Sequence, residues 1–203
     1  MLGSPLEAIA RYERARGIPA NFVNRVVVAT APAGAWSRLE RGELTLERFY
    51  PAFERDCADA GHAIDARELM AQMGASAAPR PRMLAAIRQI RAQGFKTGAL
   101  TNNWPREAGS ESDAGFREHF DAFVESSAVG MRKPDPRIYE HACAELGVPP
   151  AQAVFLDDIG RNLKPARQLG MATIKVHDPD RALAELAALL GVELAPRGEG
   201  SAG

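Results

Sequence analysis

Two adjacent carboxylates, Asp157 and Asp158, follow a short apolar run at residues 153–156. Such a run suits a strand that is buried on both faces of a parallel sheet. Ligands of open α/β sheets sit outside the carboxyl ends of the strands, and two carboxylates there repel each other unless a cation lies between them. Mg²⁺ is the natural candidate because it takes oxygen ligands and keeps waters and a substrate phosphate in its shell. The alternative is that one carboxylate merely caps the next helix.

Polar side chains also end a second predicted strand, at residues 95–100. Thr101, Asn102 and Asn103 follow it directly. A hydroxyl and an amide at a strand end could hydrogen-bond a phosphoryl oxygen. The alternative is an ordinary polar loop that contains a helix cap.

Lys133 follows the third predicted strand, at residues 122–125. The chain has 25 basic residues, and only four of them are lysines. Because most basic residues of this chain are arginines, a lysine indicates a position where a compact ammonium is needed. Lysine supplies a point charge, whereas arginine supplies a planar guanidinium with several donors. The alternative is a solvated surface lysine. Polar groups on three strand ends of one sheet are more specific than any one of them, so we expect Thr101, Lys133, Asp157 and Asp158 to face one cleft.

The elements that must position these side chains alternate along the second part of the chain. A helix, a glycine and an apolar stretch recur at Gly94-Phe95, Gly147-Val148 and Gly170-Met171. This punctuation is typical of helix C-caps that lead into parallel strands. The sequence therefore predicts an α/β fold whose parallel strands, near 95–100, 122–125, 153–156 and 172–176, are covered by helices on both faces.

The first third of the chain shows helical patterns and no convincing strand. Glycines separate helices that we expect near 4–16, 21–30, 35–41, 46–60 and 66–73. Ser4 with Glu7 and Asp65 with Glu68 have the spacing of helix N-terminal signals. We expect a helical subdomain at 1–78, a hinge near 74–81, an α/β core domain at 79–194 and a disordered tail at 195–203.

Composition narrows the choice of partner. A formal net charge of −1 gives no reason to expect nucleic acid or an anionic membrane surface as a partner. No apolar run approaches the length of about 18 residues that spans a bilayer. The two cysteines, Cys57 and Cys143, lack metal-type spacing and suit reduced thiols in a cytoplasmic protein. A small-molecule phosphate ester is the expected partner, with a homodimer as a candidate assembly.

Four stretches together resemble the haloacid dehalogenase (HAD) superfamily of phosphotransferases. They also resemble, more closely, the amino-terminal phosphatase domain of soluble epoxide hydrolases and the related domain fused to some acyl-CoA dehydrogenases. The stretches are Leu100–Trp104, Val124–Ser126, Gly130–Tyr139 and Phe155–Lys164. The resemblance runs from about Ser4 to Leu194, and it is strong in the second half and diffuse in the helical part. It implies a Rossmannoid parallel sheet with an inserted all-helical cap, so the helical subdomain at 1–78 would be that cap, with a remnant of the core at 1–4.

The resemblance also implies roles for individual residues. Thr101, with the Asn102 loop, looks like the second motif and would hold the transferring phosphoryl group. Lys133 looks like the third motif and would neutralise the nucleophile and the phosphate. Asp158 would bind Mg²⁺ directly, and Asp157 directly or through water. Asn103 and Asn162 would contribute to substrate binding.

One departure from the family pattern is serious. The family's nucleophile is an aspartate at the end of a first strand that forms the middle of the sheet, with a second aspartate two residues on as general acid. No aspartate precedes Asp56 here, and the expected first strand is absent. We expect its loss to open two buried strand edges, those of the strands ending at Leu100 and Leu156.

Two explanations for this departure stay open. One is a chain shortened at its start, and the other is a true non-catalytic homologue that serves as a binding or regulatory domain. A metal-free dehalogenase on the same fold is a further alternative, but the Asp157-Asp158 pair argues against it. We expect a Mg²⁺-dependent phosphatase when complete, acting through an aspartyl-phosphate, and an inactive chain as written.

Overall fold

The computed structural model describes residues 5–75, 81–105 and 114–194. Contacts group the chain into two compact units. Unit 1 comprises residues 1–79, 101–108 and 125–132, and unit 2 comprises residues 80–100, 109–124 and 133–203. Two loops from the second half of the sequence therefore associate with the helical first third. The Ser4 cap, most of the expected hinge and the expected disordered tail lie outside the described residues.

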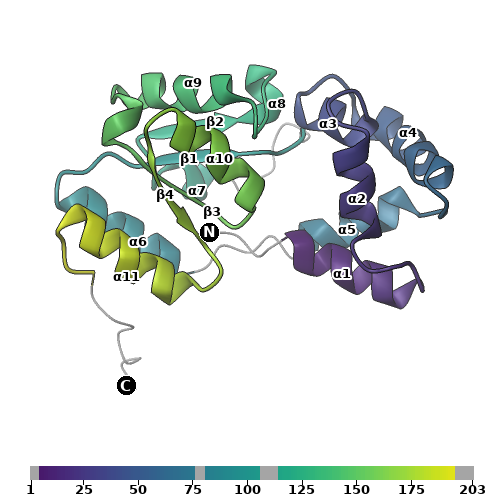
Figure 1. Ribbon diagram of the computed structural model, residues 1–203, viewed down its shortest axis with the longest axis horizontal. Coiled ribbons are helices and arrows are strands. Elements are labelled where there is room, and N and C mark those ends of the chain that lie inside the picture. Colours follow the sequence, from purple (N-terminus) through teal and green to yellow (C-terminus); the bar gives the residue numbers. More distant parts are fainter. Residues whose placement is uncertain (1–4, 76–80, 106–113, 195–203) are drawn as a thin grey trace. The chain divides into compact units, whose positions relative to one another are not determined.

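Residues 5–75, which make up most of the described part of unit 1, contain helices and no strand (Figure 1). The core of unit 1 is aromatic: the rings of Phe49 and Phe53 stack with centroids 5.3 Å apart, and Trp36 packs edge-on against Phe53 at 5.1 Å. All three side chains are buried, as amphipathic helices require when they have no sheet to pack on. The helices are α1 (Pro5–Ala15), α2 (Phe22–Ala29), α3 (Ala35–Glu40), α4 (Leu46–Asp59), α5 (Ala66–Ala75) and α8 (Ser126–Val129).

The predicted helices of the first third match these bounds to within two residues at most of their ends. The Asp65 side chain accepts a hydrogen bond from the backbone N–H of Glu68 at 2.9 Å, which confirms the expected capping signal before α5. The helix α8 was not predicted. It is a single turn, too short to show any periodicity in the sequence.

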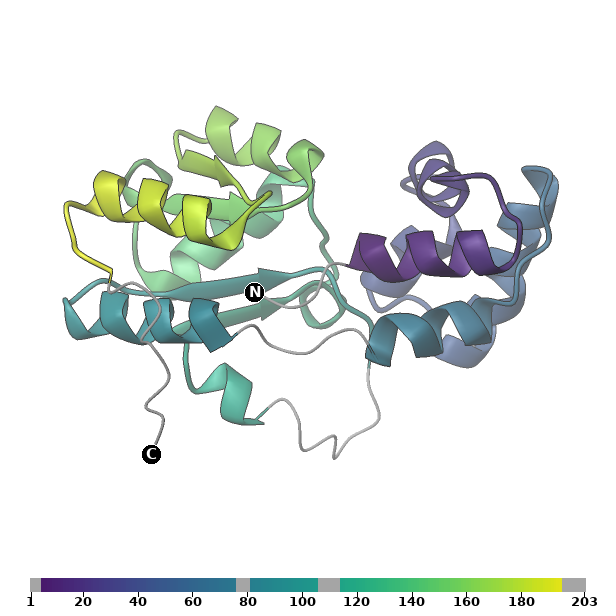
Figure 2. The ribbon, with the colours of Figure 1, turned by 90° about the horizontal axis from the view of Figure 1, so that it is seen from below.

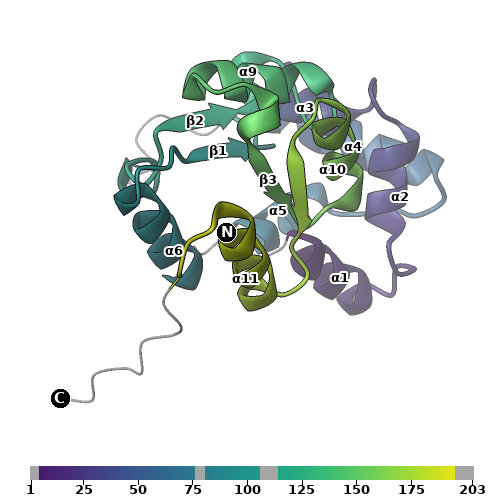
Figure 3. The same ribbon diagram turned by 60° about the vertical axis from the view of Figure 1, so that its left-hand side comes forward.

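Unit 2 alternates helices with short strands. Around β4, a buried apolar cluster brings together Met83 and Ile90 of α6, Ile174 of β4 and Leu183 of α11. Figure 3 shows α6 and α11 beside the strands of this unit. The elements are α6 (Pro81–Ala92), β1 (Gly98–Thr101), α7 (Ala114–Arg117), β2 (Ala122–Glu125), α9 (Pro136–Leu146), the 3₁₀ turn η1 (Pro150–Gln152), β3 (Val154–Asp157), α10 (Gly160–Gln168), β4 (Ala172–Lys175) and α11 (Pro179–Leu190).

The strands run parallel, as predicted. β3 pairs with β4 in register from Val154–Ala172 to Asp157–Lys175. β1 pairs with β2, and their arrowheads point the same way in Figure 2. The fold is an α/β fold of the Rossmannoid type.

Two predicted elements differ from the structure. The strand expected from Phe95 begins at Gly98, because the Phe95 N–H still bonds to the helix carbonyl of Ile90 and Thr97 bonds to the Asp121 side chain. The short helix expected at 116–120 is α7, Ala114–Arg117.

The described strands form two separate two-stranded sheets, β1–β2 and β3–β4. β3 was predicted to be buried on both faces, but Val154, Phe155 and Leu156 are only half-buried. The reason is that β3 has one neighbouring strand, so it is an edge strand here. Among the described residues, β1 likewise pairs with β2 alone.

Candidate active site

The ammonium of Lys133 lies between the ends of two strands of unit 2. Its Nζ is 2.7 Å from Oδ2 of Asp157 at the end of β3, and it donates to the backbone carbonyl of Leu100 in β1 at 2.9 Å. The Lys133 and Asp157 side chains are only 11% and 5% exposed. Lys133 is therefore no solvated surface lysine, and its buried charge is balanced by a carboxylate.

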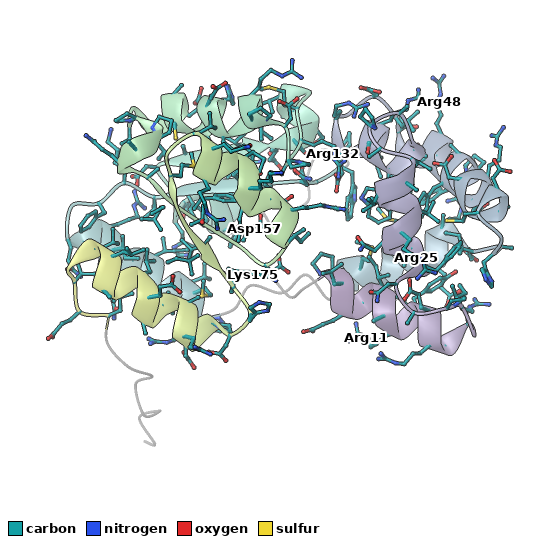
Figure 4. All side chains as sticks on the ribbon, in the orientation of Figure 1. Arg11, Arg25, Arg48, Arg132, Asp157 and Lys175 are labelled. Carbon is teal, nitrogen blue, oxygen red and sulfur yellow. The ribbon has the colours of Figure 1, made fainter. Side chains whose placement is uncertain are left out.

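Asp157 uses both carboxylate oxygens within the protein. Oδ1 accepts from the backbone N–H of Ile159 at 2.8 Å and from Nδ2 of Asn162 at 3.1 Å, while Oδ2 accepts from Lys133 and again from Asn162 at 3.2 Å. Figure 4 labels Asp157 beside Lys175, its register partner on β4. Asp157 therefore has two roles. It accepts a hydrogen bond from the turn before α10, which agrees with the helix-capping alternative, and it also pairs with Lys133.

Asn162, which was expected to bind substrate, makes hydrogen bonds within unit 2. It is buried, its amide donates to Asp157, and its backbone carbonyl accepts from the Tyr139 hydroxyl at 2.6 Å. Burial, with a smaller contribution from the charge of Asp157, raises the pKa of Tyr139, so this phenol stays a protonated donor. A direct contact of Asn162 with substrate stays a prediction.

Asp158 differs from its neighbour because it is exposed. The described residues contain no group of three or more His, Cys, Asp or Glu side chains that could hold a metal ion by themselves. One exposed carboxylate beside a second, buried one suits Mg²⁺, whose coordination shell is completed by water and substrate phosphate. It does not suit a structural Zn²⁺ site, which takes four protein ligands.

The Thr101 loop belongs to unit 1 beyond the end of β1. The Thr101 hydroxyl makes only a long contact of 3.4 Å, to the backbone carbonyl of Asn102. The Asn102 amide donates to Oε2 of Glu40 at 3.1 Å, and the Asn103 amide donates to Oε1 of Glu125 at 2.5 Å. Both amides, expected to face substrate, therefore hold the loop in place.

Of the four residues expected to converge, two are seen in contact within unit 2. Lys133 and Asp157 are in contact, and Asp158 follows them on the chain within unit 2. Thr101 belongs to unit 1 and not to unit 2. The prediction that Thr101 shares a cleft with the other three stays a prediction.

Sequence reasoning missed a buried polar group in unit 1. Glu40 and Arg132 form an ion pair, with Nε of Arg132 2.5 Å from Oε2 of Glu40 and side chains 10% (Arg132) and 9% (Glu40) exposed. The only hint was the position of Arg132 just before Lys133. Nothing local to Glu40, at the end of a short amphipathic helix, predicts a partner 92 residues away.

The comparisons with known proteins identify the family. The family model described as haloacid dehalogenase-like hydrolase matches residues 6–170, so the chain belongs to the haloacid dehalogenase-like hydrolases.

Several curated relatives match most of this chain. It is 36% identical to acyl-CoA dehydrogenase family member 10 of Mus musculus over 96% of this chain and 18% of the relative. It is 36% identical to bifunctional epoxide hydrolase 2 of Sus scrofa over 91% of this chain and 36% of the relative. The chain thus spans about a fifth and about a third of these proteins. A glyceraldehyde 3-phosphate phosphatase of Methanopyrus kandleri is 31% identical over 48% of this chain and 43% of its own length.

A solved structure supports the fold. A HAD family enzyme of Bacteroides thetaiotaomicron, in complex with magnesium and inorganic phosphate, aligns with a TM-score of 0.57 and 17% identity over 87% of this chain and 88% of its own. At that identity the likeness shows the fold alone.

Proposed function

We propose that this HAD-like hydrolase is of the phosphatase type and acts on a small-molecule phosphate ester with Mg²⁺. The observation that carries the proposal is the buried Lys133–Asp157 contact at the strand ends, with the exposed Asp158 next to it. Phosphoryl transfer depends mainly on positioning and on stabilising negative charge, and this site supplies a cation and carboxylates for a metal. A relative named as a phosphatase and a fold neighbour that binds magnesium and phosphate support the same chemistry.

The proposed roles follow from exposure and contacts. Asp158 would hold Mg²⁺ directly and Asp157 through water, since the oxygens of Asp157 already accept several hydrogen bonds. When bound, Mg²⁺ supplies positive charge to the phosphoryl oxygens. Lys133 supplies a second, fixed charge, and its contact with Leu100 keeps the ammonium at the strand ends. The Thr101 hydroxyl would donate to a phosphoryl oxygen.

The covalent step needs a nucleophile that these residues do not supply. No aspartate precedes Asp56 in the sequence, and Asp157 is held by Lys133 and Asn162. We therefore infer that the chain as written binds metal and phosphate without turning the ester over. The second candidate, a binding or regulatory domain that never turns over substrate, rests on the same missing aspartate.

Binding and turnover must be measured separately to test the proposal. Calorimetry with millimolar Mg²⁺ and inorganic phosphate should show binding that is lost in Asp158→Asn and kept in Asp59→Asn, an exposed carboxylate in unit 1. Absence of any binding by the unmodified chain would overturn the proposed site. Hydrolysis of p-nitrophenyl phosphate by the same chain would show that another residue serves as nucleophile.

A further inference from the structure

Glu40, at the end of α3, joins three other side chains of unit 1. Its Oε2 accepts from Nε of Arg132 at 2.5 Å and from Nδ2 of Asn102 at 3.1 Å, and its Oε1 accepts from the Trp36 indole at 3.0 Å. The Glu40 side chain is only 9% exposed. One buried carboxylate thus holds both the loop that follows Thr101 and the residue that precedes Lys133.

Arg132 is fixed from a second direction. Its Nη1 donates to the hydroxyl of Ser37, one turn back on α3, at 2.9 Å. Ser37 is almost fully buried. The position of Arg132 is labelled in Figure 4. A guanidinium held at two points by one helix has little freedom, so the backbone at residue 132 is tied to α3.

The turn after α3 reinforces this attachment. A Cβ on Gly42 would lie 2.4 Å from the backbone carbonyl of Ser127, and Gly42 has a φ of +72°. Only glycine permits so close an approach of the α3 turn to α8. Ser127 in turn donates from its hydroxyl to Oδ1 of Asn103 at 2.9 Å, so the loop after Thr101 is held at Asn102 and at Asn103.

We infer that Glu40 is a positioning residue for the phosphate-binding loop. It does not touch substrate. It fixes the Asn102 side chain and Arg132, and through them the backbone next to Thr101 and Lys133. Glu40 takes one N–H of the Asn102 amide, and the Thr101 hydroxyl is the proposed side-chain donor of this loop toward a phosphoryl oxygen. The part of the inference that concerns phosphate rests on the proposed function, whereas the ordering of the loop does not.

The positioning role of Glu40 must be distinguished from a purely structural role of the Glu40–Arg132 ion pair. Replacing both partners of a buried ion pair with apolar residues of similar size is often neutral for stability, whereas removing one partner leaves an uncompensated charge. The double variant Glu40→Met/Arg132→Met should therefore fold, with a moderate loss of stability because the buried Trp36 indole loses its acceptor. It still lacks the oxygen that accepts from Asn102, so it separates positioning from stability.

The matched control is Glu43→Gln. Glu43 also pairs with an arginine, Arg41, at 2.6 Å, but its side chain is 45% exposed and it does not bind the loop. The test measures urea unfolding, amide hydrogen exchange in peptides that cover residues 101–105, and binding of inorganic phosphate with Mg²⁺. Exchange in α4 serves as an internal reference.

The double variant should exchange the amides of residues 101–104 about tenfold faster than the unmodified chain, the equivalent of one lost hydrogen bond. Its urea midpoint should fall moderately, its α4 exchange should rise less than its exchange at residues 101–104, and its phosphate affinity should fall by about tenfold. Glu43→Gln should match the unmodified chain in every measurement. The single change Asn102→Ala, which leaves the ion pair in place, should reproduce the faster exchange.

The two proposals can fail separately. In a folded double variant, exchange at residues 101–104 that rises no more than exchange in α4 would overturn the positioning role. If the double variant does not fold, Asn102→Ala decides the question by the same exchange measurement. If the unmodified chain binds no phosphate, the proposed function fails, and exchange alone still decides whether Glu40 orders the loop.

Discussion

Nζ of Lys133 lies 2.7 Å from Oδ2 of Asp157, and neither side chain is more than 11% exposed. The two residues follow different strands and are 24 positions apart in sequence. Their contact puts a positive and a negative charge together at the carboxyl ends of β1 and β3. Both the stability of unit 2 and the proposed chemistry depend on this pair.

Removing the ammonium should destabilise the protein markedly. Lys133→Met keeps the length of the side chain but leaves Asp157 buried without its cation, so we expect a loss of about 3–5 kcal/mol in the free energy of unfolding. Urea unfolding measures it. The control Lys96→Met removes an exposed lysine that donates to the carbonyl of Leu146 at 2.7 Å, and it should cost no more than about 1 kcal/mol. Equal losses in the two variants would show that the Lys133–Asp157 pair is not special.

Asp158→Asn should separate metal binding from folding. Asp158 is exposed, so its replacement should change the free energy of unfolding by less than about 0.5 kcal/mol. Calorimetry should nevertheless show that Mg²⁺ affinity falls by about tenfold or more, because a charged ligand becomes a neutral one. Asp157→Asn should cost stability as well, since Asp157 accepts from Lys133 and Ile159. If Asp158→Asn were destabilised but kept normal Mg²⁺ affinity, Asp158 would be the structural residue, and its role as metal ligand would be wrong.

Adding a central strand should complete the sheet. The half-buried Val154, Phe155 and Leu156 belong to an edge strand, and within the described residues β1 and β3 each pair on one side only. We expect about ten preceding residues, with an apolar strand that ends in aspartate, to raise the free energy of unfolding by about 2–4 kcal/mol. The extended chain should also hydrolyse p-nitrophenyl phosphate with Mg²⁺.

Two controls accompany the extended chain. Asn in place of the added aspartate should keep the gain in stability and abolish turnover. Asp158→Asn in the extended chain should abolish turnover as well. An extended chain that is more stable but inert would favour the non-catalytic binding domain.

Alkaline pH should weaken unit 1 through a buried thiol. Burial, with smaller contributions from nearby acidic side chains, raises the pKa of Cys57 to about 12. The folded state therefore keeps a proton that the unfolded state releases above about pH 8.5. The resulting stability is complete below that pH and is lost as pH rises toward 12.

The variant Cys57→Ala checks this pH dependence. Between pH 8.5 and 11 its urea midpoint should fall less steeply than that of the unmodified chain. Iodoacetamide at pH 8.5 should leave Cys57 unmodified in the folded protein and alkylate it in urea. Rapid alkylation of the native thiol would contradict its burial.

Local patterns in the sequence determined the kinds of elements and most of their bounds. The period of apolar residues and the cap at Asp65 depend on neighbours within a few positions, and the structure has this cap. Both cysteines are free and buried, as expected. The sequence motifs also identified the family, which the comparisons confirm. Among the described residues there is no helix long and apolar enough to cross a membrane.

Only the tertiary structure decided which polar groups meet. Asn102, Asn103 and Asn162 each donate an amide N–H to a carboxylate of the protein, a set of partners that the sequence did not predict. Glu40 finds Arg132 across 92 positions, and Lys133 finds Asp157 across 24. No period or cap records such partners, because they depend on how loops and strand ends come together in space. A buried polar group takes whichever partner that packing brings within hydrogen-bonding distance.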